Sequence, residues 1–176
     1  DFPMYKKDKT NDIEVVKKLH ELFNEADVIV AHNGDSFDQK KATARFMVHK
    51  MAPPTPYRQI DTVKVARKYA NFNSNKLDDL GNSLGLGRKI ATGGFSLWLG
   101  CMNGVKSAWT TMKRYNKQDV ELLEKVYLEL RPWIVNHPAM NLLVGEIVAC
   151  PKCGVSGNME KNGLRANKVT TFQRWR

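Results

Sequence analysis

The chain has 176 residues, of which 42% are hydrophobic and 26% charged. This composition excludes a disordered chain and suits one ordinary domain with a core plus a small appendage. No apolar run approaches the ~20 residues that cross a bilayer, and the N-terminal DFPMYKKDKT lacks the apolar core of a secretory signal. Three cysteines cannot form a disulfide framework. We therefore expect a soluble protein of the cytoplasm or another reducing intracellular compartment, with no membrane partner.

The net charge of +10 is spread unevenly along the chain. Residues 51–115 carry 10 basic and 3 acidic side chains, and residues 150–176 carry 6 and 1. A basic surface of this kind favours a polyanion, and nucleic acid is the commonest polyanion for a soluble protein. A solvated basic face without a dedicated partner is the alternative.

The first predicted element is an amphipathic helix over residues 11–26, packed on a sheet. Its start contains Asp12-Ile13-Glu14, which has the Asp-x-Glu form of two-metal nucleases. Such a pair should lie on a buried strand, whereas here it opens a lysine-rich helix. We interpret these acids as favourable charge at a helix N-terminus.

Residues 27–38, DVIVAHNGDSFD, predict a strand, a tight polar turn and a helix. Val28 to Ala31 form the apolar run of a short buried strand, and the new helix should begin near Asp38. This arrangement aims side chains and helical N–H groups at the edge of a sheet, where α/β proteins usually place ligands. Asp38 is therefore a candidate site residue.

The next elements have structural explanations. A helix over 38–51, bearing Lys40, Lys41 and Arg45, should end at the prolines that follow. Residues 60–66 predict a strand end that runs into a helix, with Asp61 as its N-cap or as a carboxylate supporting a metal site; capping is the favoured interpretation. Residues 74–87 predict a short helix closed by glycines.

Residues 88–114 combine cations with aromatic side chains, which is what a groove for a single nucleic-acid strand needs. The alternative is that the aromatics belong to the core. The residues concerned are Arg88, Lys89, Lys106, Lys113 and Arg114, with Phe95, Trp98 and Trp109.

A helix is predicted from Met112 to Leu130, and its apolar stripe contains one carboxylate, Asp119. Tyr115 lies four residues earlier, so the two side chains are neighbours on the core-facing side. A carboxylate pointed at the interior needs a cation or hydrogen-bond donors to compensate it. The alternative is an Asp that caps the helix after a kink near Asn116.

The predicted domains are residues 1–149, an α/β domain, and residues 150–176, a small zinc-ribbon-like tail. In the tail, Cys150-Pro151-Lys152-Cys153-Gly154 has the form of a zinc knuckle, with two thiolates spaced to bind one tetrahedral ion. No second pair follows. Either Cys101 and an outside ligand contribute, or the given sequence ends before a second knuckle.

Two motifs resemble those of a known family. His32-Asn33-x-x-x-Phe37-Asp38 resembles the second motif of the DEDD-class 3'-to-5' exonucleases, which have an RNase H-like fold. Tyr115-x-x-x-Asp119 is similar to their third motif in its tyrosine form, as in the proofreading domains of family-B DNA polymerases. The resemblance runs from about Val28 to Trp133, and the order and spacing of the motifs make it more specific than either motif alone.

The resemblance implies a metal-dependent 3'-to-5' exonuclease that acts on single-stranded DNA ends. Asp38 and Asp119 would be ligands of two Mg²⁺ or Mn²⁺ ions, and Tyr115 would orient the attacking water. Phe37 would wedge against a base or fill the core, and we favour the core. The candidate substrate-binding residues are Asn33, His32, Phe37, Lys41, Arg88 and Lys89.

The sequence departs from the family in its first motif. Family members carry Asp-x-Glu on the opening strand of the sheet, and no such strand precedes Asp27. We therefore expect a fragment of a longer protein that lacks the first strands of a partial RNase H-like fold and has little or no activity by itself. The tail is similar to zinc ribbons of some phage-type nucleases and transposases, which is consistent with a phage-encoded protein. A non-catalytic nucleic-acid-binding module and a zinc-ribbon DNA-binding protein of the transposase type are the alternatives.

Overall fold

A computed structural model gives the fold. It describes residues 8, 10–89, 94–139, 149–150, 154–157, 160–166 and 171–175. The chain divides into two compact units, Asp1–Trp133 and Ile134–Arg176. This division lies earlier in the chain than the boundary after residue 149 expected from the sequence.

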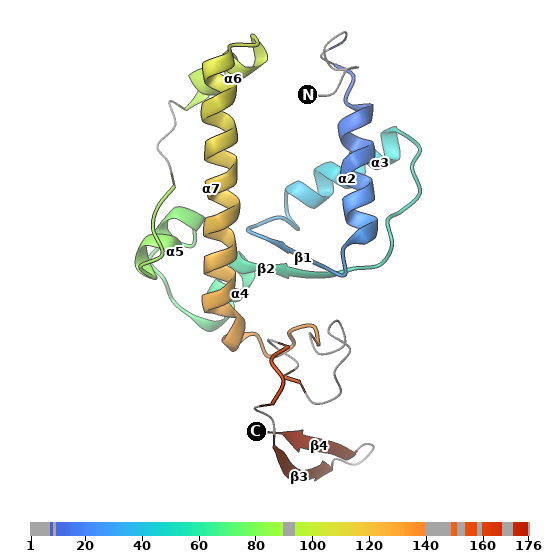
Figure 1. Ribbon diagram of the computed structural model, residues 1–176, viewed down its shortest axis with the longest axis vertical. Helices are drawn as coiled ribbons and strands as arrows, with labels where there is room; N and C mark the ends of the chain where they lie inside the picture. Colours follow the sequence, from blue (N-terminus) through green and yellow to red (C-terminus); the bar gives the residue numbers. More distant parts are fainter. Residues whose placement is uncertain are drawn as a thin grey trace. The chain divides into compact units, whose positions relative to one another are not determined.

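The first unit is a mixed α/β structure (Figure 1). Its elements, in chain order, are α2 (Ile13–Glu25), β1 (Val28–Ala31), α3 (Asp38–Val48), β2 (Arg58–Asp61), α4 (Thr62–Tyr69), α5 (Leu77–Ser83), α6 (Phe95–Met102), α7 (Lys106–Leu130) and the 3₁₀ helix η1 (Arg131–Trp133).

Strands β1 and β2 form a parallel sheet, with Ala31 opposite Asp61 at the ends of the two strands. Parallel strands need a crossover connection, and α3 lies within it. The strand predicted at Val28 to Ala31 is confirmed at the same residues, but all four are only half-buried. In the described part of the chain β1 pairs with β2 alone, which leaves part of its apolar surface uncovered.

Helices α2 and α3 pack through a small apolar core made by Val16, Ala42 and Phe46. The ring of Phe23 meets that of Phe46 edge-on, with their centroids 5.7 Å apart. These residues recur at helical spacing on each helix, so the amphipathic pattern seen in the sequence does face this core.

Helix α7 is the longest element, and α4, α5 and α6 all contact it. Leu80 of α5 and Val126 of α7 are completely buried. The helix begins at Lys106, before the predicted start, and continues without a break past Asn116. Asp119 is therefore a mid-helix residue, and the alternative of a cap after a kink is wrong.

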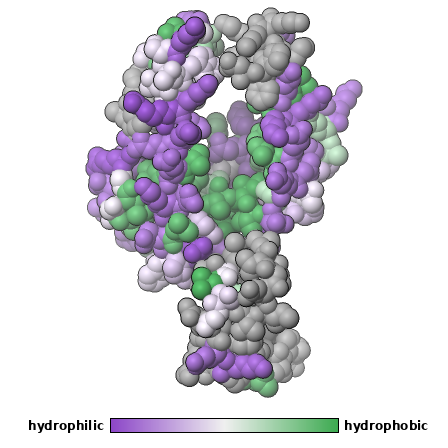
Figure 2. Space-filling model, viewed as in Figure 1, coloured by the Kyte–Doolittle hydropathy of each residue, from purple (hydrophilic) through white to green (hydrophobic). Residues whose placement is uncertain are grey.

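In the space-filling view, hydrophobic side chains gather around the strands in the middle of the first unit, between hydrophilic surfaces (Figure 2). Within the described ranges, no helix combines the length and the apolar character needed to cross a membrane.

The second unit contains a tight turn and a β-hairpin. The Gly154 N–H donates to the Cys150 carbonyl at 2.8 Å, the Cys150 N–H donates to the Val155 carbonyl at 2.9 Å, and Ala149 bridges to Ser156 in antiparallel fashion. Strands β3 (Lys161–Ala166) and β4 (Thr171–Trp175) then pair antiparallel. Cys153, the second predicted zinc ligand, lies outside the described residues.

Candidate active site

The carboxyl ends of β1 and β2 bring together a group of polar side chains, the strand-end cluster: Asn33, Asp35, Asp61 and Lys64. Asp61 Oδ1 accepts hydrogen bonds from the backbone N–H of Val63 at 3.0 Å and of Asn33 at 2.9 Å. The first bond caps α4, as the sequence predicted. The second holds Asn33 at φ 63°, a left-handed conformation that Asn tolerates better than most residues.

A carboxyl pair lies within the strand-end cluster. Asp61 is 6% exposed, and its Oδ2 has no hydrogen-bond partner within the described part of the chain. Burial, and next the neighbouring Asp35 carboxyl, raise the pKa of Asp61. The Asp61 carboxyl and the Lys64 ammonium, which is ion-paired with Asp35, hold the pKa of Asp35 at about 2. Asp35 is therefore the carboxyl of the pair that ionises first.

His32 fastens the turn after β1 to the elements beyond it. Its Nε2 lies 2.9 Å from the Asn75 carbonyl and its Nδ1 2.8 Å from Thr62 Oγ1. Burial is the largest cause of a lowered His32 pKa. The Thr62 hydroxyl also donates to the Ala31 carbonyl at 3.1 Å, so it joins the His32 ring to the end of β1. Both ring nitrogens of this predicted substrate-binding residue are thus engaged within the protein.

Asp38 is the first residue of α3, and its side chain is exposed. Phe37 precedes it and is 59% exposed, so our preference for a core role is wrong. The reason is helical geometry: Phe37 lies nine residues before Phe46, the core residue, and nine residues place it on the opposite side of α3. The ammonium of Lys41 lies 5.9 Å from the Phe37 ring centroid.

Tyr115 and Asp119 meet a cation from another part of the chain, Lys89. The Lys89 ammonium lies 2.7 Å from Asp119 Oδ2 and 3.5 Å from the Tyr115 hydroxyl. Burial opposes the charged form of Lys89, but its contacts with Asp119 and then Tyr115 outweigh burial and raise its pKa. The backbone N–H of Lys89 donates to Asp78 Oδ1 at 2.6 Å, which ties this segment to α5.

The other carboxylate oxygen of Asp119, Oδ1, differs from Oδ2 in its contacts. Asp119 Oδ1 is buried, and no described residue hydrogen-bonds to it. A buried carboxylate oxygen without a donor is costly, and a bound cation is one group that would compensate it. Among the described residues, however, no three His, Cys, Asp or Glu side chains come together as metal ligands.

The remaining sequence candidates are distributed over the first unit. Arg88 is exposed and donates through Nε to Asn82 Oδ1 at 2.9 Å. Phe95 and Trp98 are 74% and 58% exposed, so neither is a core residue. Trp109 donates its indole N–H to the Cys101 carbonyl at 2.9 Å.

Asp12, the first acid of the Asp-x-Glu sequence near the N-terminus, has a structural role. The guanidinium of Arg45 donates to both oxygens of Asp12 at 2.6 Å, and His49 Nε2 lies 2.8 Å from Asp12 Oδ1. The Arg45 contacts are the largest cause that lowers the pKa of Asp12 to about 2. Asp12 thus ties α2 to the end of α3.

Sequence reasoning missed two members of the strand-end cluster, Asp35 and Lys64. The available signal was position: Asp35 lies in the turn after β1, and Lys64 lies three residues after the cap Asp61. Parallel strands end at the same edge of a sheet, so polar residues after both strands converge.

Comparison with protein-family models identifies the class. The model described as the RNase H superfamily matches residues 2–131, and the chain belongs to this superfamily. The mixed α/β structure with its small parallel sheet fits a partial RNase H-like fold. Membership indicates a nuclease-like hydrolase that binds nucleic acid. A search of curated proteins found no match.

Proposed function

We propose that this chain is the metal-dependent 3'-to-5' exonuclease domain of its gene product and acts on single-stranded DNA ends. The observation that carries the proposal is the contact of Lys89 with Tyr115 and Asp119, next to the unsatisfied Asp119 Oδ1. A tyrosine hydroxyl and a carboxylate four residues apart, both contacted by one ammonium group, are groups that can orient water and hold a cation beside a phosphodiester. The strand, turn and helix that carry Asp38 support the same proposal.

In the proposed mechanism the residues have separate tasks. Tyr115 orients the attacking water through its hydroxyl. Lys89 keeps the side chains of Tyr115 and Asp119 in place, and its positive charge faces the phosphate. Asn33 and Lys41 bind the terminal nucleotide, and the exposed ring of Phe37 stacks against its base. His32 has an indirect role, because its two ring contacts fix the turn that carries Asn33.

Asp38 and Asp119 would hold the Mg²⁺ or Mn²⁺ ions. When bound, such ions activate water and neutralise the charge on the phosphate. The orphaned Asp119 Oδ1 fits a ligand of a hard cation. Two carboxylates are fewer than a pair of divalent ions needs, so the full site requires acids beyond those that the described residues bring together.

The test uses the whole gene product, including any residues that precede Asp1. It is incubated with a 5'-labelled single strand, with Mn²⁺ or with EDTA. The proposal expects a metal-dependent ladder that shortens from the 3' end, lost at least 100-fold in Asp119→Asn. Glu124→Gln on the exposed side of α7 is the matched control and should keep activity. Laddering that survives Asp119→Asn would refute the site assignment.

A second candidate function is a nucleic-acid-binding module without hydrolysis. The observation that favours it is the absence of a three-ligand acidic group among the described residues. It predicts strand binding in Mn²⁺ with no cleavage by the whole gene product, so the same assay separates the two functions.

We also propose a structural zinc ion in the second unit, bound by Cys150 and Cys153. The described turn supports it, because the backbone bonds between Cys150 and residues 154 and 155 close the kind of loop that zinc knuckles use. Metal analysis of the whole gene product should find one zinc ion per chain, and Cys150→Ser should remove it. Zinc-free protein would refute this proposal.

A further inference from the structure

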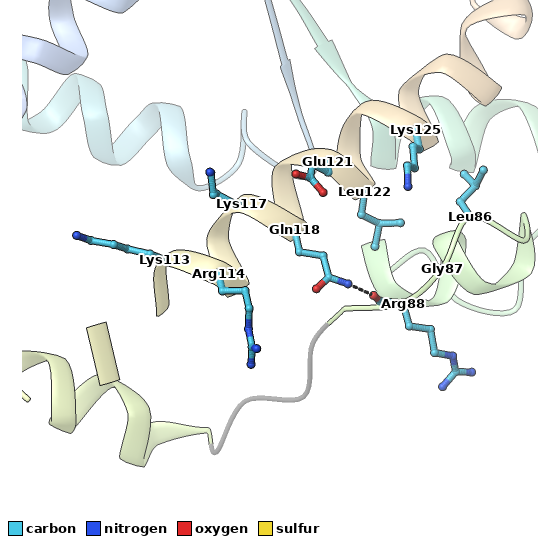
Figure 3. Close-up of a pocket in the computed structure, with 10 residues that line it drawn as sticks. All are labelled: Leu86, Gly87, Arg88, Lys113, Arg114, Lys117, Gln118, Glu121, Leu122 and Lys125. Carbon is cyan, nitrogen blue, oxygen red and sulfur yellow. Dashed lines mark hydrogen bonds between the residues drawn. The ribbon is translucent and has the colours of Figure 1, made fainter. Parts of the chain in front are cut away.

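A basic groove of about 560 Å³ lies between α7 and the segment that follows α5 (Figure 3). Leu86 and the buried Leu122 contribute apolar surface to it. The Gln118 side chain donates to the Arg88 carbonyl at 2.8 Å and so fixes the Leu86–Arg88 segment against the helix. The groove thus has two walls joined by a hydrogen bond.

The charges of the groove are strongly unbalanced. Glu121 is its one acidic lining residue, against five cations, and all six side chains are exposed. No ion pair neutralises any of these cations within the described ranges. The five are Arg88, Lys113, Arg114, Lys117 and Lys125.

The groove is separate from the proposed catalytic residues. At 3.6 residues per turn, Lys117 and Lys125 point away from the side of α7 that carries Asp119. In Figure 3, Gln118 extends from α7 to the Leu86–Arg88 segment, and Arg114 and Lys125 point to the same side of the helix. A ligand in the groove would therefore leave the Tyr115–Asp119 side of the helix accessible.

The residues that line the groove favour a nucleic-acid duplex over a single strand. They include no aromatic side chain, whereas sites for single strands use aromatic rings on which unpaired bases stack. A duplex keeps its bases stacked inside and presents phosphates outside. On α7 the cations Lys113 and Lys117 are four residues apart, about 6 Å along the axis, so the helix offers charges in a row to successive phosphates.

We propose that this groove binds the phosphate backbone of a nucleic-acid duplex, independently of hydrolysis. The chain would then have two nucleic-acid surfaces: the Lys89–Tyr115–Asp119 side for a single-stranded end, and the groove for the duplex beside that end. The contacts are with phosphates and are independent of base sequence.

The test measures binding by fluorescence anisotropy in EDTA, so that no hydrolysis occurs and a failed exonuclease proposal does not affect the result. The probe is a blunt 20-base-pair duplex, and the groove variant is Arg114→Gln, Lys117→Gln and Lys125→Gln. Arg88 is left unchanged because it is a candidate for the proposed substrate site. Loss of three phosphate contacts should lower the slope of log K against log salt by about 3 and the affinity roughly tenfold or more.

The matched control removes the same charges elsewhere: Lys17→Gln, Arg58→Gln and Lys68→Gln, all exposed and all outside the groove. The proposal expects duplex binding close to that of the parent chain. Equal losses in the groove and control variants would overturn it, because they would reflect net charge alone. A loss confined to a 20-nucleotide single strand would also overturn it.

Two further variants guard against unfolding as an explanation. Arg114→Lys, Lys117→Arg and Lys125→Arg keep the charges and should keep duplex affinity. Glu121→Gln removes the one acid of the groove and should tighten duplex binding several-fold, which an unfolded protein cannot do. A Glu121→Gln protein with unchanged affinity would contradict the proposal.

The last experiment measures binding to vesicles with 30% anionic lipid. If the groove variant loses vesicle binding but keeps duplex binding, the groove is a membrane-binding surface instead.

Discussion

The ammonium of Lys89 lies 2.7 Å from Asp119 Oδ2, although the two residues are 30 positions apart. Their side chains are 29% and 21% exposed, so the ion pair is screened less than one on the surface. Asp119 Oδ1 is meanwhile buried without a hydrogen-bond partner among the described residues. Lys89 is therefore the main compensation that the described structure offers to this carboxylate.

Lys89→Met should lower the free energy of unfolding by about 1–2 kcal/mol, between the values for exposed and buried pairs. The reason is that Asp119 would lose its cation while staying half-buried. Urea unfolding of Lys89→Met, Asp119→Asn and the double variant gives the coupling energy of the pair. Lys76→Met, at an exposed lysine before α5, is the control and should change little. A coupling energy of zero would show that the contact does not stabilise the fold.

The same substitution bears on metal binding. The Lys89 ammonium contacts Asp119 Oδ2, next to the Oδ1 that the proposed ion would use. Its positive charge repels a cation there, so a protein without it should bind Mn²⁺ more tightly. Titration of Lys89→Met and the parent chain, followed by the electron paramagnetic resonance of free Mn²⁺, measures this affinity without any activity assay. Weaker Mn²⁺ binding by Lys89→Met would contradict this prediction and show that the positioning of Asp119 by Lys89 outweighs the repulsion between the ammonium and the ion.

Asp12→Asn should destabilise the chain by about 1 kcal/mol, a value reduced for the partial exposure of its ion pair with Arg45. The pKa of Asp12 is lowered to about 2, so its contribution is present above the unfolded pKa of about 4 and is lost as pH falls toward 2. The difference between parent and variant in urea unfolding should therefore shrink from pH 6 to pH 3. Glu25→Gln, at the exposed end of α2, should show no such change. A loss of Mn²⁺ affinity in Asp12→Asn would revive the Asp-x-Glu reading of this position.

Local patterns in the sequence predicted local structure well. The apolar run Val28 to Ala31 and the polar turn after it located β1, and Asp61 was predicted and found as the cap of α4. A strand followed by a turn, or a cap followed by a helix, depends on hydrogen bonds between near neighbours. Such information is contained in a few consecutive residues.

Contacts between distant elements were not predictable in the same way. The partner of Asp12 is Arg45, 33 positions away, and the cation at Asp119 comes from the loop after α5. Such pairs depend on how elements pack, which periodicity does not specify. The exposure of Phe37 has the same origin, because an isolated motif does not say which side of α3 faces α2.

Asp61→Asn should flatten the dependence of stability on pH. Burial and then Asp35 raise the pKa of Asp61 in the folded state, so the folded chain binds the proton more tightly than the unfolded chain. Its stabilising contribution is full below the unfolded pKa of about 4 and is lost as pH rises through the folded pKa. Asn keeps the acceptor for Asn33 and Val63 but cannot ionise.

The measurement is the free energy of unfolding of parent and Asp61→Asn from pH 4 to pH 7.5. The variant should gain stability relative to the parent as pH rises. Asp61→Ala is the comparison. Like Asp61→Asn it cannot ionise, but it also loses the cap, so it should be less stable than Asp61→Asn by about 0.5–2 kcal/mol at every pH. A constant difference between the parent and Asp61→Asn would contradict the protonation of this pair.

Gly81→Ala should destabilise the chain even though alanine favours a helix by about 1 kcal/mol over glycine. Gly81 is buried in α5, and a Cβ built there would lie 2.8 Å from the Gly87 carbonyl oxygen and 2.8 Å from a methyl group of Leu122. The first neighbour is backbone and cannot rotate away, so overpacking should cost about 1–3 kcal/mol. The net expectation is a lower midpoint of urea unfolding, and Ser83→Ala, exposed in the same helix, should stay within about 0.5 kcal/mol of the parent. Because Gly87 also lines the basic groove, Gly81→Ala should weaken duplex binding as well. If Gly81→Ala is as stable as the parent chain or more stable, α5 does not pack against α7 this closely.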